Sequence, residues 1–453
     1  MSSLSSLDFS LSKTVVVLIG VLVLAVLDLV SRLRGRNGHF LFAAVLGTVL
    51  SVGLIRVTEG LLSPGVRENG HLVALGVVLV LVMWRMLFGD WEVTTKTTVL
   101  GTFAAWVGMH LLWGHPSGER FAYALAILVA SVPAGIWCTL FLKYHSQRLG
   151  IVLLMFLSGV VATMPVLFYD ALVRNNVELQ FFLLRIIPES FHTTTESFVS
   201  GQLSVSHELA STLTTLFLSF IFVGLIEEGS KLWVLRHSGE KLFRSIDDAL
   251  QLGILVAIGF AFAENVANPS YFVGFVKEYI ITAAKSDWSG FIGNVAGRSI
   301  LTSMVHIVST GVMGYYLGLA VFADPLLRDA GSRGQRFRLI EYLHGLLGIG
   351  KTTLFRREML LTGLVLATCL HALSNFLVTF PDVLPGDPRT LGALLHSAPG
   401  SFLHYISLLL LPSLLYIVGG FWLLTFLFER KENMKERGHR VTVDTFITEN
   451  TLY

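Results

Sequence analysis

The chain has 453 residues, of which 53% are hydrophobic and 14% charged, and its formal net charge is +2. A soluble globular protein carries roughly 25% charged residues, so the composition excludes a soluble enzyme and indicates a polytopic membrane protein. Both cysteines, Cys138 and Cys369, fall inside apolar runs. We therefore expect neither a disulfide framework nor a cysteine-based zinc site.

Several apolar runs are long enough to cross a bilayer, which takes about 20 helical residues. They lie near 14–30, 40–57, 71–88, 97–113, 121–142, 149–168, 209–235, 249–267, 299–321, 359–380 and 402–428. The predicted fold is therefore an all-α, polytopic transmembrane helix bundle of about 11 helices. The first run has no basic segment before it beyond Lys13 and no clear cleavage site after it, so we expect a retained helix and not a signal peptide.

Lysine and arginine residues between the runs predict the orientation, because cytoplasmic loops are enriched in them. With the N-terminus outside, the inside segments hold 21 of these residues and the outside segments hold 9. The predicted topology is N-out/C-in, in the cell (plasma or inner) membrane. The amphipathic stretch 271–285 is expected to lie at the membrane interface; a further crossing there would invert the downstream half.

Two long loops and one motif need separate interpretation. The outside loop 169–208 is acidic and is expected to be a solvated connector, with a lid or substrate-docking element as the alternative. The inside loop 322–358 carries seven basic residues that suit anionic lipid headgroups. Residues 345–352 fit the pattern G-x-x-x-x-G-K-T, but a phosphate loop requires a strand and a helix of a nucleotide-binding domain. We expect neither nucleotide binding nor a nucleic-acid partner.

Ionisable residues deep in the apolar runs are the candidates for function, since a charge in hydrocarbon costs several kcal/mol unless it faces protein or a wet cavity. All of them lie in four consecutive runs. They are Glu227, Glu228, Lys231, Glu264, His306 and His371.

Helical spacing brings some of these groups onto shared faces. Residues four apart lie on one side of a helix, which pairs Glu227 with Lys231 and His371 with Asn375. At about 1.5 Å per residue, Glu264, His306 and His371 come to similar depths, but Glu227 lies closer to the cytoplasmic side. Its helix must therefore be tilted, broken near Gly229 or shifted for the groups to meet.

This set of groups suits hydrolysis. A buried carboxylate can take a proton from water, and histidine or asparagine can stabilise an oxyanion. Two histidines and a glutamate also match a hydrolytic zinc site with one open position. Structural ion pairs and interhelical hydrogen bonds are the alternative explanation for the same residues. The spacing does not decide between zinc and metal-free glutamate chemistry.

The order of the motifs resembles that of the PrsW family of intramembrane proteases, which is related to the type II CAAX prenyl proteases. The matching elements are Glu227-Glu228-x-x-Lys231, Asp248 followed by Glu264-Asn265, His306, and His371-x-x-x-Asn375. The resemblance implies catalytic roles for Glu227, Glu228, Glu264, His306, His371 and Asn375, and supporting roles for Lys231, Asn265 and Asp248. The family is regarded as metal-dependent or glutamate-dependent, and its namesake cleaves a membrane-spanning anti-sigma factor.

We therefore expect an intramembrane endopeptidase that makes a site-1-type cut in a single-span membrane protein within the lipid bilayer. Residues 121–428 would form the protease core, 1–120 accessory membrane helices and 429–453 a cytoplasmic tail. If zinc is bound, Glu264, His306 and His371 are the predicted ligands. Arg298 could meet a substrate or lipid phosphate, and we expect lipid phosphate. A proton- or ion-coupled secondary transporter and a catalytically inactive membrane scaffold remain as alternatives.

Overall fold

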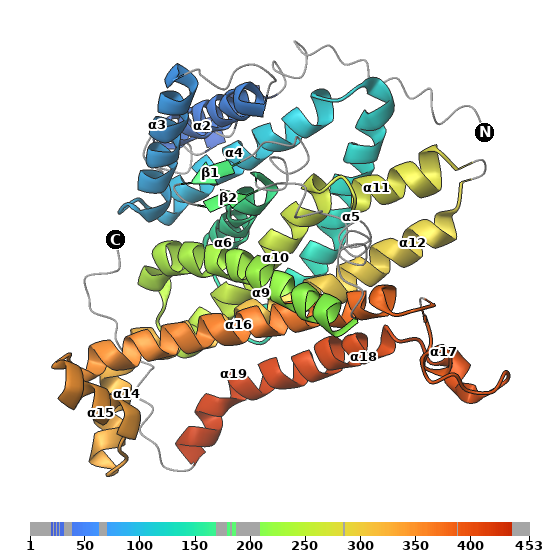
Figure 1. Cartoon of the computed structure of the whole chain (residues 1–453). Coiled ribbons are helices and arrows are strands. Elements are labelled where there is room, and N and C mark those ends of the chain that lie inside the picture. The colour runs from blue at the N-terminus through green and yellow to red at the C-terminus, as the bar shows by residue number, and fades with distance from the viewer. Residues whose placement is uncertain are drawn as a thin grey trace.

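The computed structural model describes residues 39–62, 70–168, 179–181, 184–186, 209–283, 286–386 and 388–436, with scattered positions between 20 and 30. Nearly all of this is helix (Figure 1). The α-helices are α2 (His39–Leu62), α3 (Gly70–Phe88), α4 (Val93–Trp113), α5 (Ser117–Phe141), α6 (Leu149–Ala162), α9 (Leu209–Val234), α10 (Ile246–Ala267), α11 (Phe272–Val276), α12 (Trp288–Gly297), α13 (Ser303–Val321), α14 (Ala323–Ser332), α15 (Arg338–Leu347), α16 (Lys351–Val383), α17 (Leu391–Leu394), α18 (Leu410–Ser413) and α19 (Gly420–Glu436).

Short π-helical or 3₁₀ segments extend several of these helices. They are η2 (Leu235–Gly239), η3 (Glu240–Leu242), η4 (Lys277–Ile281), η5 (Arg298–Thr302), η6 (Phe402–Tyr405) and η7 (Leu414–Gly419). Two three-residue strands, β1 (Leu179–Phe181) and β2 (Leu184–Ile186), form an antiparallel hairpin. This hairpin departs from the predicted all-α fold, within a loop whose other residues lie outside the described part of the chain.

Seven helices of the described residues are long and apolar enough to cross a membrane: His39–Gly60, Glu119–Phe141, Leu149–Phe168, Ile246–Ala267, Trp288–Val321, Lys351–Val383 and Leu410–Arg430. Three further predicted runs appear as the helices α3, α4 and α9. The first run, 14–30, and the end of the tail, 437–453, lie largely or wholly outside the described residues. The helical membrane fold is confirmed, while the count of 11 and the N-out/C-in orientation stay predictions.

Helix α10 is the centre of the bundle. It packs against α5, α6 and α13, and most of its side chains are buried. Its first turn is fixed by a capping box, in which the Ser245 hydroxyl accepts from the Asp248 N–H and the Asp248 carboxylate accepts from the Ser245 N–H. Asp248 therefore acts at the start of α10 and lies at the end opposite Glu264.

Glycines allow α10 and α6 to cross in close contact. A Cβ added at Gly259 would overlap the Phe156 carbonyl, and one added at Gly159 would overlap the Val256 carbonyl. Small residues at such crossings are the usual means by which membrane helices approach each other, since lipid provides no hydrophobic driving force. This crossing fixes the position of α10 along its axis relative to α6.

The segment after α10 is helical, and the helix that follows it is longer than the sequence predicts. Helices α11 and α12 run side by side and project from the bundle (Figure 1). Helices α12, η5 and α13 then continue as one 34-residue helix from Trp288 to Val321. The predicted start at residue 299 was wrong, because Asn294 and Arg298 interrupt the apolar run without breaking the helix.

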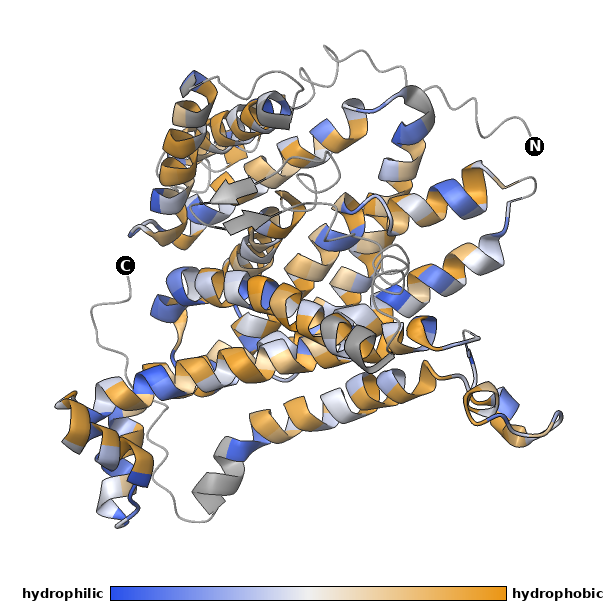
Figure 2. Cartoon of the chain, viewed as in Figure 1, coloured by the Kyte–Doolittle hydropathy of each residue, from blue (hydrophilic) through white to orange (hydrophobic). Residues whose placement is uncertain are grey.

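Hydropathy varies along the helices. The long helices show mainly hydrophobic residues, whereas hydrophilic ones lie mostly toward helix ends and on α11, α12, α14 and α15 (Figure 2). The segment 345–352 is the turn between α15 and α16, where Gly348 takes a left-handed φ of 66°. It joins two helices, which is not the strand-to-helix connection of a phosphate loop.

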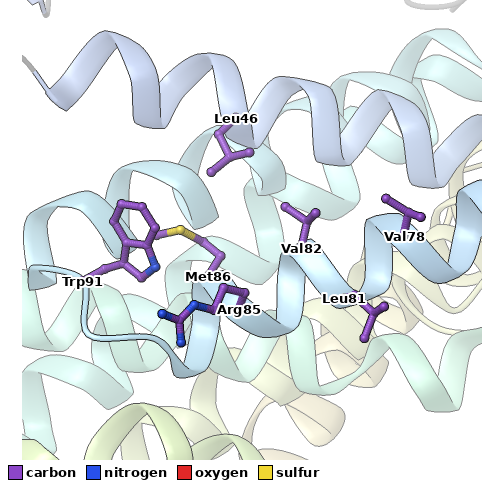
Figure 3. A pocket seen from close by; sticks show the side chains of 7 residues that line it. All are labelled: Leu46, Val78, Leu81, Val82, Arg85, Met86 and Trp91. Atoms are coloured by element: carbon purple, nitrogen blue, oxygen red, sulfur yellow. The ribbon is translucent and has the colours of Figure 1, made fainter.

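The N-terminal helices enclose a pocket of their own. It has a volume of about 270 Å³ and lies between α2, α3 and the turn that follows α3 (Figure 3). Its lining is apolar apart from Arg85 and the indole nitrogen of Trp91. The pocket holds no carboxylate, histidine or cysteine, so it is not a candidate for the chemistry predicted above.

Candidate active site

Four helices bring the predicted ionisable residues together in the interior. Glu227, Glu228 and Lys231 come from α9, Glu264 from α10, His306 from α13 and His371 from α16. Glu228 and Lys231 are fully buried, and Glu227, His306 and His371 are at most 5% exposed. Helix α9 is not broken at Gly229; it continues as η2 to Gly239, which places Glu227 deeper than its predicted run implied.

Glu228 is saturated with hydrogen bonds. Its Oε1 accepts from the Lys231 ammonium at 2.8 Å and from His371 Nδ1 at 2.9 Å, while Oε2 accepts from the Thr310 hydroxyl at 2.9 Å. A buried charge is tolerated only when it is paired and hydrogen-bonded. This carboxylate therefore has little capacity left for a reacting molecule and instead orients the groups around it.

Lys231 is the internal cation of the site. Its Nζ lies 2.8 Å from His306 Nδ1 and 3.6 Å from Glu227 Oε2, in addition to its bond to Glu228. The ammonium also lies 3.8 Å from the centre of the Phe260 ring, a cation–π contact. An ammonium can only donate, so His306 Nδ1 accepts.

These donors fix the tautomers of the two histidines. Because His306 Nδ1 accepts from Lys231, its Nε2 carries the proton and donates to Glu264 Oε2 at 3.1 Å. In His371 the order is reversed: Nδ1 donates to Glu228, so in the neutral ring Nε2 carries the lone pair. The partner of one ring nitrogen sets the role of the other, as in metal sites and catalytic triads.

Glu227 has a carboxylate oxygen that accepts no hydrogen bond from any described residue. Its Oε2 is buried and has no hydrogen-bond partner among the described residues, and it lies 3.6 Å from His371 Nε2. Two lone-pair atoms that face each other require a proton, a water molecule or a cation between them. The chemistry of a hydrolytic site could take place in this gap.

The same gap fits a metal ion. One ligand atom each from Glu227, His306 and His371 lie within 4.8 Å of one another, and two histidines with one carboxylate form a known hydrolytic ligand set. The predicted set contained Glu264 in place of Glu227. Glu264 lies on the other side of His306, where it accepts from His306 Nε2 and pairs with Arg298.

Arg298 is held inside the protein, so the prediction that it contacts lipid phosphate was wrong. Its Nε donates to Asn265 Oδ1 at 2.6 Å, its Nη2 lies 3.3 Å from Glu264 Oε1, and its guanidinium stacks on the Tyr271 ring. Burial raises the pKa of Tyr271, in the turn after α10, to about 12, so the phenol stays neutral. Asn265, predicted as a supporting residue, holds Arg298 beside Glu264.

Two uncharged polar residues, Thr310 and Asn375, also lie on the helices that form the cluster. Thr310 was not predicted from the sequence, because ionisable residues were selected and a hydroxyl is uncharged. Its spacing of four residues from His306, which places both on one face of the helix, could have indicated it. Asn375 lies one helical turn beyond His371 on α16 and is half-buried. Within the described part of the chain its amide has no hydrogen-bond partner, so it remains available.

The cluster is almost completely buried, but one edge of it is more exposed to solvent than the rest. The Glu264 and Arg298 side chains are 15% and 16% exposed, against 7% or less for the side chains of Glu227, Glu228, Lys231, His306 and His371. Glu264 lies in the last turn of α10 and Arg298 begins η5. Solvent therefore comes closest to the cluster beside these two residues.

Comparison with known proteins agrees with this geometry. No curated protein and no solved structure matches the chain. The sequence profile of a family described as PrsW family intramembrane metalloprotease matches residues 147–398, which is more than half of the chain and contains every residue of the cluster. The chain therefore belongs to the PrsW family of intramembrane metalloproteases.

Proposed function

We propose that the protein is an endopeptidase whose reacting water binds between Glu227 and His371. The observation that carries the proposal is the buried Oε2 of Glu227, which accepts no hydrogen bond among the described residues and lies 3.6 Å from His371 Nε2. A site that serves structure alone would pair these atoms, because an unsatisfied buried carboxylate oxygen costs more than it contributes. An active site keeps them for water and substrate.

The residues divide into reacting and positioning groups. Glu227 takes a proton from the water, whose oxygen attacks the peptide carbonyl carbon, and then gives that proton to the leaving amine as the C–N bond breaks. Asn375 supplies an amide donor for the oxyanion. Glu228, held by Lys231 and Thr310, fixes the orientation of His371.

In a metal-dependent alternative to Glu227 as a free base, the donor set suits a zinc ion held by Glu227, His306 and His371. A bound zinc ion would supply Lewis-acid polarisation and lower the pKa of a water molecule on it. The Lys231 ammonium donates a hydrogen bond to His306 Nδ1. That nitrogen can bind a metal only if the ammonium first moves away from it, toward Glu228. Lys231 thus balances the charge of the two α9 glutamates when the ligands are free.

The open edge beside Glu264 and Arg298 suits an extended peptide backbone. In the predicted topology this edge faces outside, since the last turn of α10 is at its outer end. We infer a single-span membrane protein as the substrate, cut in a site-1-type reaction such as that of an anti-sigma factor in the cell membrane. The protease core would span 121–428, because Trp137 and Phe141 of α5 and Leu424 of α19 share one buried cluster with α10 and α13.

The test is cleavage of a panel of single-span membrane proteins by the purified protein in detergent. Glu227→Gln should lower the rate by about 10²–10⁴-fold, the usual effect of losing a general base. Asn375→Ala should lower it by about 10²–10³-fold as an oxyanion donor. Glu278→Gln, an exposed acid outside the cluster, is the control and should leave cleavage unchanged.

Metal dependence is measured in the same assay. If zinc is the bound ion, a chelator abolishes cleavage and added zinc restores it, and Glu227→Gln and His371→Ala lower the zinc content of the purified protein. Cleavage that survives exhaustive chelation assigns metal-free glutamate chemistry. Cleavage that survives both substitutions would refute the site, and substrate binding without cleavage in the wild type would favour the inactive scaffold.

A further inference from the structure

A second polar cavity lies at the opposite end of α10, away from the Glu227–His371 site. It has a volume of about 520 Å³, within the range of ~300–1,000 Å³ typical of small-molecule sites. Its lining comes from the segment before α6, from the segment before α10 and from the starts of both helices. The lining residues are His145, Ser146, Gln147, Arg148, Ile151, Leu242, Arg244, Ser245 and Asp248.

Two helices begin at this cavity. Arg148 is the N-cap of α6 and Ser245 is the N-cap of α10. The N-terminus of a helix carries a partial positive charge and free N–H groups, which favours anions. Arg148 makes no side-chain cap, so the first N–H groups of α6 are not closed off by its side chain.

Positive charge also dominates the cavity wall. Asp248, the one carboxylate of the lining, already accepts from His145 Nε2, from Gln147 and from the backbone N–H groups of Arg244 and Ser245. The side chains of Arg148 and Arg244 are exposed and have no hydrogen bond or ion pair within the described residues. Two free guanidinium groups thus face one cavity whose acid is internally satisfied.

We propose that this cavity binds a phosphate group. Guanidinium groups bind phosphate oxygens in a bidentate manner, and the N-terminus of α6, which has no side-chain cap, adds backbone donors; the N-terminus of α10 is closed by its own capping box. Both segments, 143–148 and 236–248, are on the predicted cytoplasmic side, at the level of lipid headgroups. The phosphate comes either from an anionic lipid headgroup or from a soluble phosphate compound.

Two binding assays on the whole protein separate these sources. In the first, native mass spectrometry counts phosphatidylglycerol molecules retained on the protein after transfer from nanodiscs, with phosphatidylcholine nanodiscs for comparison. In the second, calorimetry measures binding of inorganic phosphate in detergent. The double variant Arg148→Gln/Arg244→Gln should weaken binding of the true source at least tenfold, since two charge-assisted contacts are lost.

The matched control is Arg236→Gln/Lys241→Gln, because the basic residues of 322–358 are themselves expected to contact lipid headgroups. It removes the same charge from exposed positions on the same predicted side, outside the cavity. If the cavity variant, but not the control, binds phosphatidylglycerol more weakly, the ligand is a lipid headgroup. If the cavity variant loses only the binding of inorganic phosphate, the ligand is a soluble phosphate compound. Arg148→Lys/Arg244→Lys should keep part of the affinity. Equal losses in both glutamine variants, or no specific phosphate binding by the wild type, would overturn the proposal.

Discussion

At the scale of single residues, Thr310 links α13 to the orienting glutamate. Its hydroxyl donates to Glu228 Oε2 at 2.9 Å, and the side chain is fully buried. Thr310→Val keeps the shape but leaves that oxygen unpaired, so His371 loses part of its fixed orientation. We expect kcat to fall about 10–100-fold, the usual cost of losing an outer-shell partner, with KM unchanged.

Ser309 provides the control for Thr310. It is equally buried, but its hydroxyl has no hydrogen-bond partner in the described part of the chain. Ser309→Ala should therefore leave kcat unchanged, and Thr310→Ser should restore most of the activity lost in Thr310→Val. An unaltered kcat in a well-folded Thr310→Val protein would show that the contact does not position Glu228.

Arg298 should be sensitive to substitution even by lysine. Its planar guanidinium reaches Glu264 and Asn265 and also stacks on Tyr271, and an ammonium cannot reproduce all three contacts. We expect Arg298→Lys to lower kcat/KM at least tenfold, measured by substrate cleavage. Lys277→Arg, at the half-buried pair with Glu119 outside the cluster, should have no effect. Full activity in Arg298→Lys would show that cleavage does not require the combined contacts of the guanidinium with Glu264, Asn265 and Tyr271.

The sequence predicted the charged members of the cluster because a charge in an apolar run is rare and costly. It also paired Glu227 with Lys231, which lie 3.6 Å apart, but it did not reveal the contacts between helices. Whether Glu227 or Glu264 faces His371 depends on the rotation of α9 and α10 about their axes, which the packing of neighbouring helices decides. Thr310 and the partners of Arg298 were missed for the same reason, since each contact joins residues on different helices.

At the scale of helices, the α6–α10 crossing should tolerate no added atom. A methyl group at Gly259 would meet the Phe156 carbonyl, and backbone cannot move aside as a flexible side chain can. Gly259→Ala should destabilise the protein by about 1–3 kcal/mol, as overpacked cores do, measured by thermal unfolding in detergent. Gly135→Ala on α5, where a Cβ meets nothing within 4 Å, should cause no loss. Equal stability of both variants would show that this crossing has room.

Helix positions were predicted better than helix ends. Apolar runs locate the centres of the helices because burial in lipid requires them. The ends were missed where polar residues are satisfied within the protein: Arg298 stays in the helix from Trp288 to Val321 because Glu264 and Asn265 receive its charge and its N–H groups. The π-helical segment η5 begins at this residue, as π-bulges often do at functional sites.

At the scale of the whole molecule, the orientation in the membrane decides from which side substrate arrives. The predicted topology places the turn near Ala398 outside and the segment at Ser332 inside; both residues are exposed in the fold. We expect a membrane-impermeant maleimide to label Ala398→Cys in intact cells, and to label Ser332→Cys only after the cells are opened. Both changes are made in a chain in which Cys138 and Cys369 are replaced by alanine.

That labelling pattern would place the exposed edge at Glu264 and Arg298 on the outer side, because α10 runs from the predicted cytoplasmic segment 236–248 toward that edge. Cleavage would then occur in the outer half of the bilayer, and the phosphate cavity at the start of α10 would face the cytoplasm. The unsubstituted alanine background, which should stay unlabelled in both states, is the control. The reverse pattern would place the catalytic edge inside, exclude a site-1-type cut from the outside, and move the proposed phosphate site to the outer surface.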